Sequence, residues 1–224
     1  DMYEYLYQRL TEDNSDIAAC GVQMVWENKK LCRMLTRAGS CVLNQEEAMR
    51  AIIEESWLKQ PVWYKLYKTD LIRDILFPMG KCHEDVFWSY QAVGSAKKVS
   101  VSDHVGYYYL QRGGSIMGAG YSLKRLDAVE AKVQRCAYIQ ERFPVLSPLV
   151  IKDLWFTCIY QGQLALRELP LTESRSTMLY LEKTLANIPL RSRAGGLKEI
   201  VWLTMANINF LKTCKIRNAL GIGL

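Results

Sequence analysis

The first part of the chain alternates between helical and extended hydrophobic patterns. Apolar residues recur at helical spacing at the start, which predicts an amphipathic helix over residues 2–12. Residues 17–26 (IAACGVQMVW) then alternate with a period of two, which predicts a strand. A polar turn at residues 27–30 follows, and residues 31–36 predict a second, shorter strand.

The next predicted elements are short. Asn44 and Glu47 have the spacing of a capping box, so we expect a helix to begin there and to continue through Ile53. Residues 62–67 are rich in aromatic side chains and predict an extended segment. Residues 71–75 predict one or two turns of helix.

A helix and two further strands are expected before a glycine-rich stretch. Residues 84–96 predict a helix, because their apolar side chains line one face. Residues 98–102 and 106–110 predict two strands that flank a turn at Asp103-His104. Residues 111–120 contain four glycines, which predict a mobile loop.

Beyond this loop the hydrophobic pattern is helical. The sequence therefore predicts a mixed α/β part over residues 1–121 and an all-helical region over residues 122–224. No apolar run approaches the length of about 18 residues that a membrane-spanning helix needs. The helical segments expected in the second part are 126–143, 148–168, 172–186 and 197–219.

Charge is distributed unevenly between the two parts. Residues 113–224 hold 15 Lys/Arg against 8 Asp/Glu, whereas residues 1–112 hold 14 against 15. The basic second half suggests an anionic neighbour, such as phospholipid headgroups, a lipid pyrophosphate or nucleic acid. Aromatic residues are not interleaved with the basic ones and no nucleic-acid-binding motif occurs, so we expect no nucleic-acid partner.

The seven cysteines are scattered, without any C-x-x-C pair, and the chain has two histidines. This pattern favours neither a zinc cluster nor a disulfide framework. Reduced thiols are the simpler interpretation, and they predict a cytoplasmic location.

Five short motifs follow one another in a fixed order. Taken together, they closely resemble the second half of the catalytic domain in bacterial family 2 glycosyltransferases, which have the GT-A fold. Members of that family read K-L-Y-K, F-P-x-G, E-D, Y-x-Y and R-x-x-S in this order, and the resemblance covers roughly residues 1–121. The motifs in this chain are Trp63–Lys68 (WYKLYK), Phe77–Lys81 (FPMGK), His83–Asp85 (HED), Tyr107–Arg112 (YYYLQR) and Ser115–Ile116 (SI).

The resemblance implies the C-terminal half of a GT-A mixed sheet with flanking helices. It also implies inverting transfer of a sugar from a nucleotide-sugar to a glycan or polyprenyl-linked acceptor, in surface polysaccharide assembly. In the family, the helix resembling residues 2–10 comes directly after a metal-binding Asp-x-Asp segment. We therefore expect the nucleotide-binding half to be missing here and the chain by itself to be inactive. A divalent metal, Mg or Mn, is expected only with that segment, so we expect no metal site in these residues.

The acidic pair Glu84-Asp85 is the candidate for catalysis. Inverting transfer needs a base for the acceptor hydroxyl, and a helix N-terminus favours an ionised carboxylate. The resemblance assigns the base to Asp85, with Glu84 supporting the geometry or contacting the acceptor. The alternative is that both carboxylates simply cap the helix.

Other candidate residues follow from the same resemblance. The segment of Trp63 and Lys65 would line the acceptor side of the cleft, with His83 as a further acceptor contact. Trp63 or its neighbour Tyr64 could stack on a sugar ring, although packing in the core is the alternative for at least one of them, and for the stem of Lys65. Arg112 and Ser115 would belong to the loop that closes over the donor pyrophosphate, the alternative being a solvated surface loop.

The end of the chain combines basic and apolar side chains. A segment of this kind could contact a membrane surface, which would place the protein peripherally at the inner face of the membrane. An oligomer formed through the apolar stripe is an equal alternative. A non-catalytic interaction or assembly module derived from the same family is the second hypothesis for the whole chain. The residues concerned are Lys198, Trp202, Leu203, Phe210, Leu211, Lys212, Lys215 and Arg217.

Overall fold

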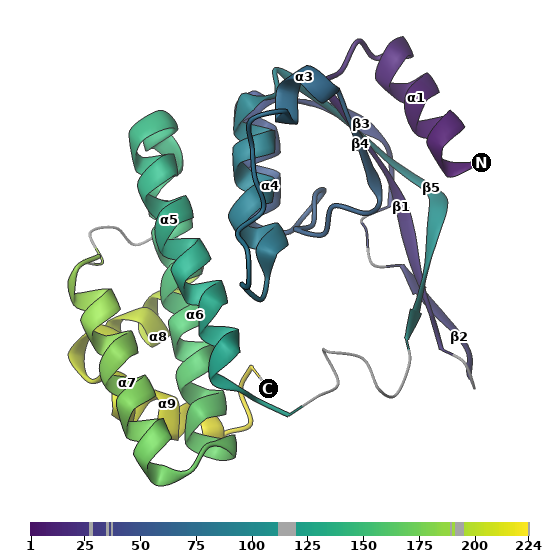
Figure 1. The fold of residues 1–224 in the computed structure, drawn as a ribbon. Coiled ribbons are helices and arrows are strands. Elements are labelled where there is room, and N and C mark those ends of the chain that lie inside the picture. The colour runs from purple at the N-terminus through teal and green to yellow at the C-terminus, as the bar shows by residue number, and fades with distance from the viewer. Residues whose placement is uncertain are drawn as a thin grey trace. The chain divides into compact units, whose positions relative to one another are not determined.

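The computed structural model divides the chain into two compact units (Figure 1). The α/β unit comprises Asp1–Gly80 and Glu84–Ala119, and the helical unit comprises Lys81–His83 and Gly120–Leu224. The mixed α/β architecture followed by a helical region is as predicted. Residues described by the structure are 1–26, 29–34, 36, 38–111, 120–188, 190 and 195–223, with the backbone alone for 29–34.

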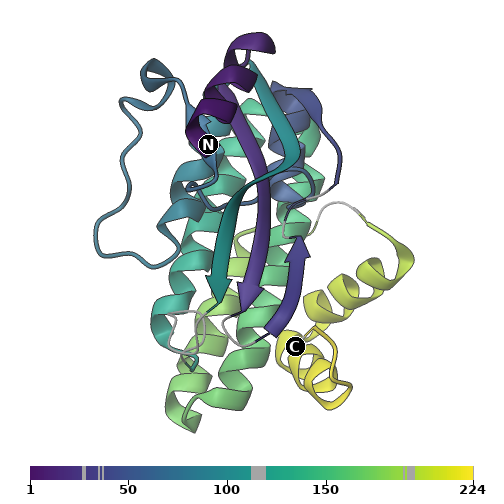
Figure 2. The same ribbon diagram turned by 90° about the vertical axis from the view of Figure 1, so that its right-hand side faces the viewer.

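A five-stranded mixed sheet forms the centre of the α/β unit, in the order β2-β1-β5-β3 with β4 also beside β1. β1 and β5 run parallel and side by side, as Figure 2 shows, whereas the other pairings are antiparallel. Because β5 follows one edge of β1 throughout, β4 and β2 share its other edge, β4 at the start and β2 at the end. The strands are β1 Ile17–Trp26, β2 Lys29–Met34, β3 Cys41–Asn44, β4 Lys65–Tyr67 and β5 Lys98–Gln111.

The strand expected at residues 17–26 is confirmed, but the two strands expected around Asp103-His104 form one continuous strand, β5. The register between β1 and β5 shifts on both sides of Gly21. The turn-forming pair therefore lies at an irregularity within a long parallel pairing, and this pairing overrides its local preference for a turn.

Gly21 makes this irregular pairing sterically feasible. A Cβ atom at this position would overlap the carbonyl oxygen of Asp103 and lie 2.9 Å from the carbonyl oxygen of His104. Gly106 on β5 is similarly confined, since a Cβ atom there would lie 2.8 Å from Sγ of Cys20. Gly21 thus lets the two backbones approach closely, whereas Gly106 leaves room for the side chains of Cys20 and Met2.

The predicted helices of the α/β unit are confirmed, except that the short helix expected at residues 71–75 lies earlier, over Thr69–Ile72. Asp1 caps the first helix by accepting hydrogen bonds from the backbone N–H groups of Tyr3 and Glu4. The capping box of Asn44 and Glu47 is present at the start of α2, with bonds of 3.0 and 2.9 Å. The helices are α1 Met2–Glu12, α2 Gln45–Ile53, α3 Thr69–Ile72 and α4 Glu84–Ser95.

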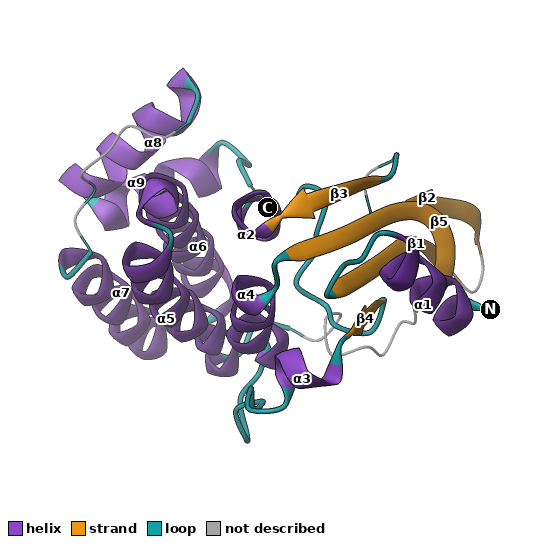
Figure 3. Ribbon diagram, turned by 90° about the horizontal axis from the view of Figure 1, so that it is seen from above, coloured by secondary structure: helices purple, strands orange, loops and turns teal. Residues whose placement is uncertain are grey.

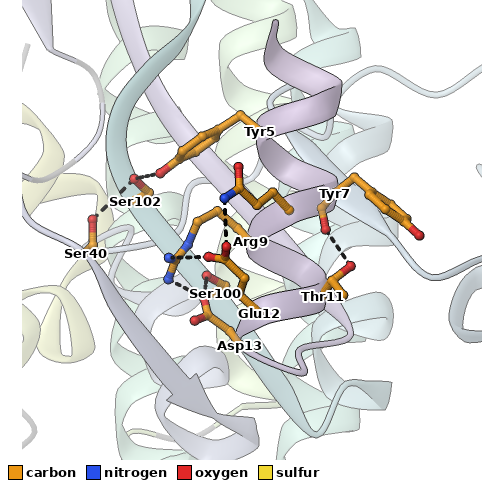
Figure 4. A network of polar contacts seen from close by, with 10 residues as sticks. Tyr5, Tyr7, Arg9, Thr11, Glu12, Asp13, Ser40, Ser100 and Ser102 are labelled. Carbon is orange, nitrogen blue, oxygen red and sulfur yellow. Dashed lines mark hydrogen bonds and ion pairs between the residues drawn. The ribbon is translucent and has the colours of Figure 1, made fainter.

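Polar contacts hold α1 against β5 (Figure 4). The hydroxyl groups of Tyr5 and Ser102 lie 2.6 Å apart, and Ser100 donates to the carboxylate of Asp13 at 2.5 Å. The same carboxylate accepts a hydrogen bond from Arg9, one helical turn before it. The amphipathic helix predicted from apolar spacing is thus fixed on the sheet by hydrogen bonds as well as by its apolar face.

The helical unit is arranged around α6, which contacts α5, α7, α8 and α9. The predicted segment 197–219 is divided at Asn209, whose side chain accepts a hydrogen bond from the backbone N–H of Lys212 and so caps α9. None of the described helices is long and apolar enough to cross a membrane. The elements are η2 Leu123–Leu126, α5 Asp127–Arg142, η3 Pro144–Leu146, α6 Ser147–Glu168, α7 Leu171–Ala186, α8 Leu197–Ile208 and α9 Phe210–Ala219.

Buried polar groups connect these helices. Arg135 on α5 is fully buried and lies 2.5 Å from the carboxylate of Asp153 on α6, which Lys132 also contacts at 3.0 Å. Gln163 on α6 accepts a hydrogen bond from Nε of Arg217 on α9 at 3.0 Å. The pairing of α6 with both neighbours is therefore specified by charge and hydrogen bonding as well as by packing.

Candidate functional site

The loop that precedes β4 closes around a buried lysine. Lys65 is 5% exposed, and its Nζ donates to the backbone carbonyls of Lys59 at 2.6 Å and Pro61 at 2.5 Å. The same ammonium lies 4.3 Å from the centre of the Tyr64 ring. Lys65 therefore fixes the conformation of the loop from which Trp63 projects.

Tyr64 strengthens the same loop from the inside. Its side chain is fully buried, and its hydroxyl accepts a hydrogen bond from the backbone N–H of Lys59 at 2.7 Å. Burial raises the pKa of the Tyr64 hydroxyl far above its usual value. Of the two adjacent aromatic residues, Tyr64 is thus the one that packs in the core, and Trp63 is half-buried.

Burial also shifts the protonation of the lysine. It lowers the pKa of Lys65 from its ordinary value to about 7, while the negative charges of Asp85 and Glu55 oppose this shift. Lys65 lies on β4 and Asp85 in the first turn of α4, and burial outweighs the charge of Asp85 in setting this pKa.

Glu84 and Asp85 both lie in the first turn of α4, as predicted. Glu84 is exposed, whereas Asp85 is half-buried. Besides Lys65, the Asp85 charge acts on Tyr67, whose pKa burial raises well above its usual range and the negative charges of Tyr64 and Asp85 raise further. The charge of Asp85 therefore acts on the pKa values of both Lys65 and Tyr67.

Trp63 lies over two tyrosines of β5. Its ring centre is 4.2 Å from that of Tyr107 and 5.1 Å from that of Tyr109, with interplanar angles of 32° and 39°. Alternation along the strand puts Tyr107 and Tyr109 on one face and Tyr108, which is 66% exposed, on the other. We call this group of three rings the aromatic cluster; its members are Trp63, Tyr107 and Tyr109.

Further contacts fix the start of α4. The indole N–H of Trp88 donates to the carbonyl of Ile75 at 2.9 Å, and the Phe77 ring stacks on the Trp88 ring with centres 5.0 Å apart. Ser89 donates to the carbonyl of Gln60 at 2.6 Å, which ties α4 to the loop of Trp63. These contacts hold the segment before α4 and the loop before β4 on the same helix, so the Asp85 carboxylate has a defined position.

The other predicted residues belong to the helical unit or lie outside the described part of the chain. His83 is half-buried, has a left-handed backbone with a φ of 58°, and belongs to the segment Lys81–His83 of the helical unit. Lys81, from the same segment, pairs with Glu130 at 2.6 Å and with Asp127 at 3.3 Å. Arg112 and Ser115, predicted for the pyrophosphate loop, lie outside the described residues.

The sequence alone does not identify the whole aromatic cluster. The Y-x-Y motif belongs to the resemblance, which implies no role for Tyr107 or Tyr109. Their alternation in a strand would have placed both on one face, whereas their contact with Trp63 depends on how the chain folds back.

The resemblance implies a divalent metal only together with an Asp-x-Asp segment. Among the described residues, no group of three or more His, Cys, Asp or Glu side chains is arranged to hold an ion.

Two comparisons with known proteins found no match. The sequence matches no protein-family model, and a search of curated proteins finds no match either. The geometry around Lys65, Asp85 and the aromatic cluster, together with the order of the motifs, is what bears on function.

Proposed function

We propose that the α/β unit is the acceptor-side half of an inverting glycosyltransferase with a GT-A fold, acting in surface polysaccharide assembly. The observation that carries this proposal is the aromatic cluster on the loop that Lys65 closes, together with Asp85 in the first turn of α4, the helix that Ser89 ties to the same loop. The order of the five sequence motifs supports it independently. In this proposal the donor is a nucleotide-sugar and the acceptor a glycan or a polyprenyl-linked sugar.

The aromatic cluster would bind the acceptor sugar. One face of a pyranose ring presents mainly C–H groups, which pack on aromatic rings, while its hydroxyl groups need polar partners at the edge. Trp63 is half-buried and lies against two tyrosines, so part of a rigid aromatic surface is accessible at a small cost in side-chain entropy. The loop held by Lys65 fixes the orientation of this surface.

Asp85 would act as the catalytic base. Its carboxylate accepts the proton of the acceptor hydroxyl while the hydroxyl oxygen forms a bond to the anomeric carbon. The bond from that carbon to the diphosphate oxygen breaks, and both of its electrons leave with the nucleoside diphosphate. Attack from the side opposite to the leaving group inverts the anomeric centre. The positive end of the α4 dipole favours the ionised carboxylate before each turnover.

Lys65 would serve as a positioning residue. Its ammonium bonds to the carbonyls of Lys59 and Pro61, so it closes the loop instead of facing solvent. The negative charge of Asp85 favours the protonated form of Lys65, which makes these bonds. Lys65 would therefore hold the sugar-binding surface in place.

Binding of saccharides by the chain tests this proposal. Saturation-transfer NMR with methyl glycosides of common hexoses and N-acetylhexosamines, and with short oligosaccharides, would detect the bound face of the ring. We expect Trp63→Ala to weaken binding at least about tenfold, the loss of one aromatic contact. Tyr108→Ala is the matched control, because Tyr108 lies on the opposite face of β5 and is exposed.

Three outcomes would contradict the proposal. These are no binding of any saccharide by the wild type, binding unchanged in Trp63→Ala, and an equal loss in Tyr108→Ala. Any of them would favour the second hypothesis, a non-catalytic assembly module.

A further inference from the structure

Three consecutive carbonyl groups in the loop before β4 each accept a hydrogen bond from a side chain. The carbonyls of Lys59 and Pro61 accept from Nζ of Lys65 at 2.6 and 2.5 Å. The carbonyl of Gln60, between them, accepts from the hydroxyl of Ser89 at 2.6 Å. Because one donor comes from β4 and the other from α4, the backbone of this loop is held by two different elements.

The side chain of Gln60 attaches the same loop to a third element. It is 5% exposed, and its Nε2 donates to the carbonyl of Ile52 in α2 at 2.9 Å. Helices α2 and α4 lie side by side, as Figure 3 shows. Gln60 is therefore fixed to both helices, to α2 through its amide and to α4 through the hydroxyl of Ser89.

Ser89 makes its hydrogen bond from the interior of the α/β unit. Its side chain is 1% exposed, so water does not compete for the carbonyl of Gln60, and removal of the hydroxyl would leave this buried carbonyl without its donor. A serine in a helix can bond to its own helix instead, as Ser95 does by donating to the carbonyl of Gln91 at 3.0 Å. The hydroxyl of Ser89 joins two segments that lie 29 residues apart.

The proposed base lies on the same face of α4 as Ser89. Asp85 precedes Ser89 by four residues, a spacing that places the two side chains on one side of a helix, about 6 Å apart along its axis. On the loop, Trp63 follows Gln60 by three residues. A short series of covalent and hydrogen bonds thus leads from Trp63 to the helix turn that carries Asp85, and it passes through Gln60 and Ser89.

We propose that Ser89 is a positioning residue, which holds the aromatic cluster at a fixed distance from the carboxylate of Asp85. This inference rests on the proposed function, in which the cluster binds the acceptor sugar and Asp85 takes the proton of its hydroxyl. That proton is transferred only when the hydroxyl comes within hydrogen-bonding distance of the carboxylate. A misplacement of about 1 Å is enough to lower turnover by about 10²-fold.

This role predicts different effects on sugar binding and on turnover. The contacts of Trp63 with Tyr107 and Tyr109 do not involve the hydroxyl of Ser89, so the sugar-binding surface itself is retained when the hydroxyl is removed. We therefore expect Ser89→Ala to change the saccharide dissociation constant and the acceptor KM by less than about twofold. Turnover should fall by about 10–100-fold, because the bound sugar no longer meets the carboxylate in the same geometry.

Kinetics of the complete gene product, together with saccharide binding, test this inference. Release of nucleoside diphosphate at varied acceptor concentration gives kcat and KM, and saturation-transfer NMR gives the saccharide dissociation constant. Ser89→Thr keeps a hydroxyl donor and should recover most of the lost turnover. Ser89→Cys keeps nearly the same volume but supplies only a weak donor, so it should behave like Ser89→Ala.

Ser95→Ala is the matched control. It removes a hydroxyl from the same helix, but one that bonds within that helix, so its kcat and saccharide binding should equal those of the wild type. Urea unfolding of each variant shows whether it is folded under the assay conditions. If Ser89→Ala does not fold, Ser89→Cys is the variant in which the loss of turnover is measured, because it leaves no cavity.

Three results would overturn the inference. The first is wild-type turnover in folded Ser89→Ala or Ser89→Cys, and the second is a rise in KM without a fall in kcat. The third is turnover in Ser89→Thr no higher than in Ser89→Ala, although Ser89→Thr folds as stably as the wild type. Failure of the proposed function gives a different result, since the wild type itself would then neither bind a saccharide nor release nucleoside diphosphate, and the inference would fall with it.

Discussion

Replacing Lys65 by Met should change how the stability of the α/β unit depends on pH. Met keeps an unbranched side chain of similar length and removes the titrating ammonium. In the wild type this ammonium is 5% exposed and lies between the carbonyls of Lys59 and Pro61. Comparing the two proteins at each pH isolates the titration of Lys65, because other groups that titrate in the same range are present in both.

The magnitude follows from linkage between proton binding and folding. Burial lowers the pKa of Lys65 from 10.5 to about 7, so between these pH values the folded state binds fewer protons than the unfolded state. Stability conferred by this position therefore rises with pH across that window. The same relation gives a rise of about 2.5 kcal/mol between pH 6 and pH 9.

Urea unfolding at pH 6, 7, 8 and 9, followed by circular dichroism and tryptophan fluorescence, measures this difference. We expect the unfolding free energy of the wild type, relative to Lys65→Met, to increase steadily over the series. Lys97→Met, which removes an exposed lysine, controls for the loss of one positive charge. A difference between wild type and Lys65→Met that stays constant within about 0.5 kcal/mol would refute the burial of a charged lysine at this site.

Two further substitutions test the fold that positions the site. Gly21→Ala should lower the unfolding free energy by about 2–4 kcal/mol in urea titrations, because its Cβ would overlap the β5 carbonyls and neither backbone can move freely. Gly120→Ala is the control, since a Cβ there meets nothing within 4 Å, and an equal loss in the two variants would contradict the prediction. Asn44→Ala should cost about 1 kcal/mol through loss of the α2 cap, with Asn44→Asp retaining most of the stability; equal stability of Asn44→Ala and the wild type would show that the capping box contributes nothing.

Elements with a local signal were predictable from the sequence. The cap of α2 depends on Asn44 and Glu47, which lie three residues apart, and the period-two pattern of β1 lies within ten consecutive residues. The long helices of the second unit were also predictable, because each repeats its apolar positions over several turns. Such patterns depend on neighbours along the chain and not on the final fold.

Features set by contacts between distant residues were not predictable. A turn was expected at Asp103-His104, but these residues lie within β5, where the strand pairs with β1. The extended segment expected at 62–67 is a strand only over Lys65–Tyr67. Its first residues instead form the loop that closes on Lys65. The break at Asn209 also escaped prediction, since the apolar pattern continues through it.

The same distinction applies to the candidate site. The position of Asp85 at the start of a helix could be inferred from the E-D pair and the apolar residues after it. That Lys65 is buried, and that Trp63 lies over Tyr107 and Tyr109, depends on contacts between segments far apart in the sequence. Neither periodicity nor composition carries that information.

The most direct test of the proposed activity is the effect of Asp85→Asn on glycosyl transfer by the complete gene product. Release of nucleoside diphosphate from a panel of UDP-, GDP- and dTDP-sugars, in the presence of saccharide and polyprenyl-linked acceptors, would be followed at saturating acceptor. Asp70→Asn is the control, because the Asp70 side chain is 90% exposed and pairs with Arg73 on the surface. We predict that Asp85→Asn lowers turnover by about 10²–10⁴-fold, the usual contribution of a general base, while Asp70→Asn turns over like the wild type. Transfer by Asp85→Asn at the wild-type rate, or no release from any donor by the wild type, would contradict the proposed function.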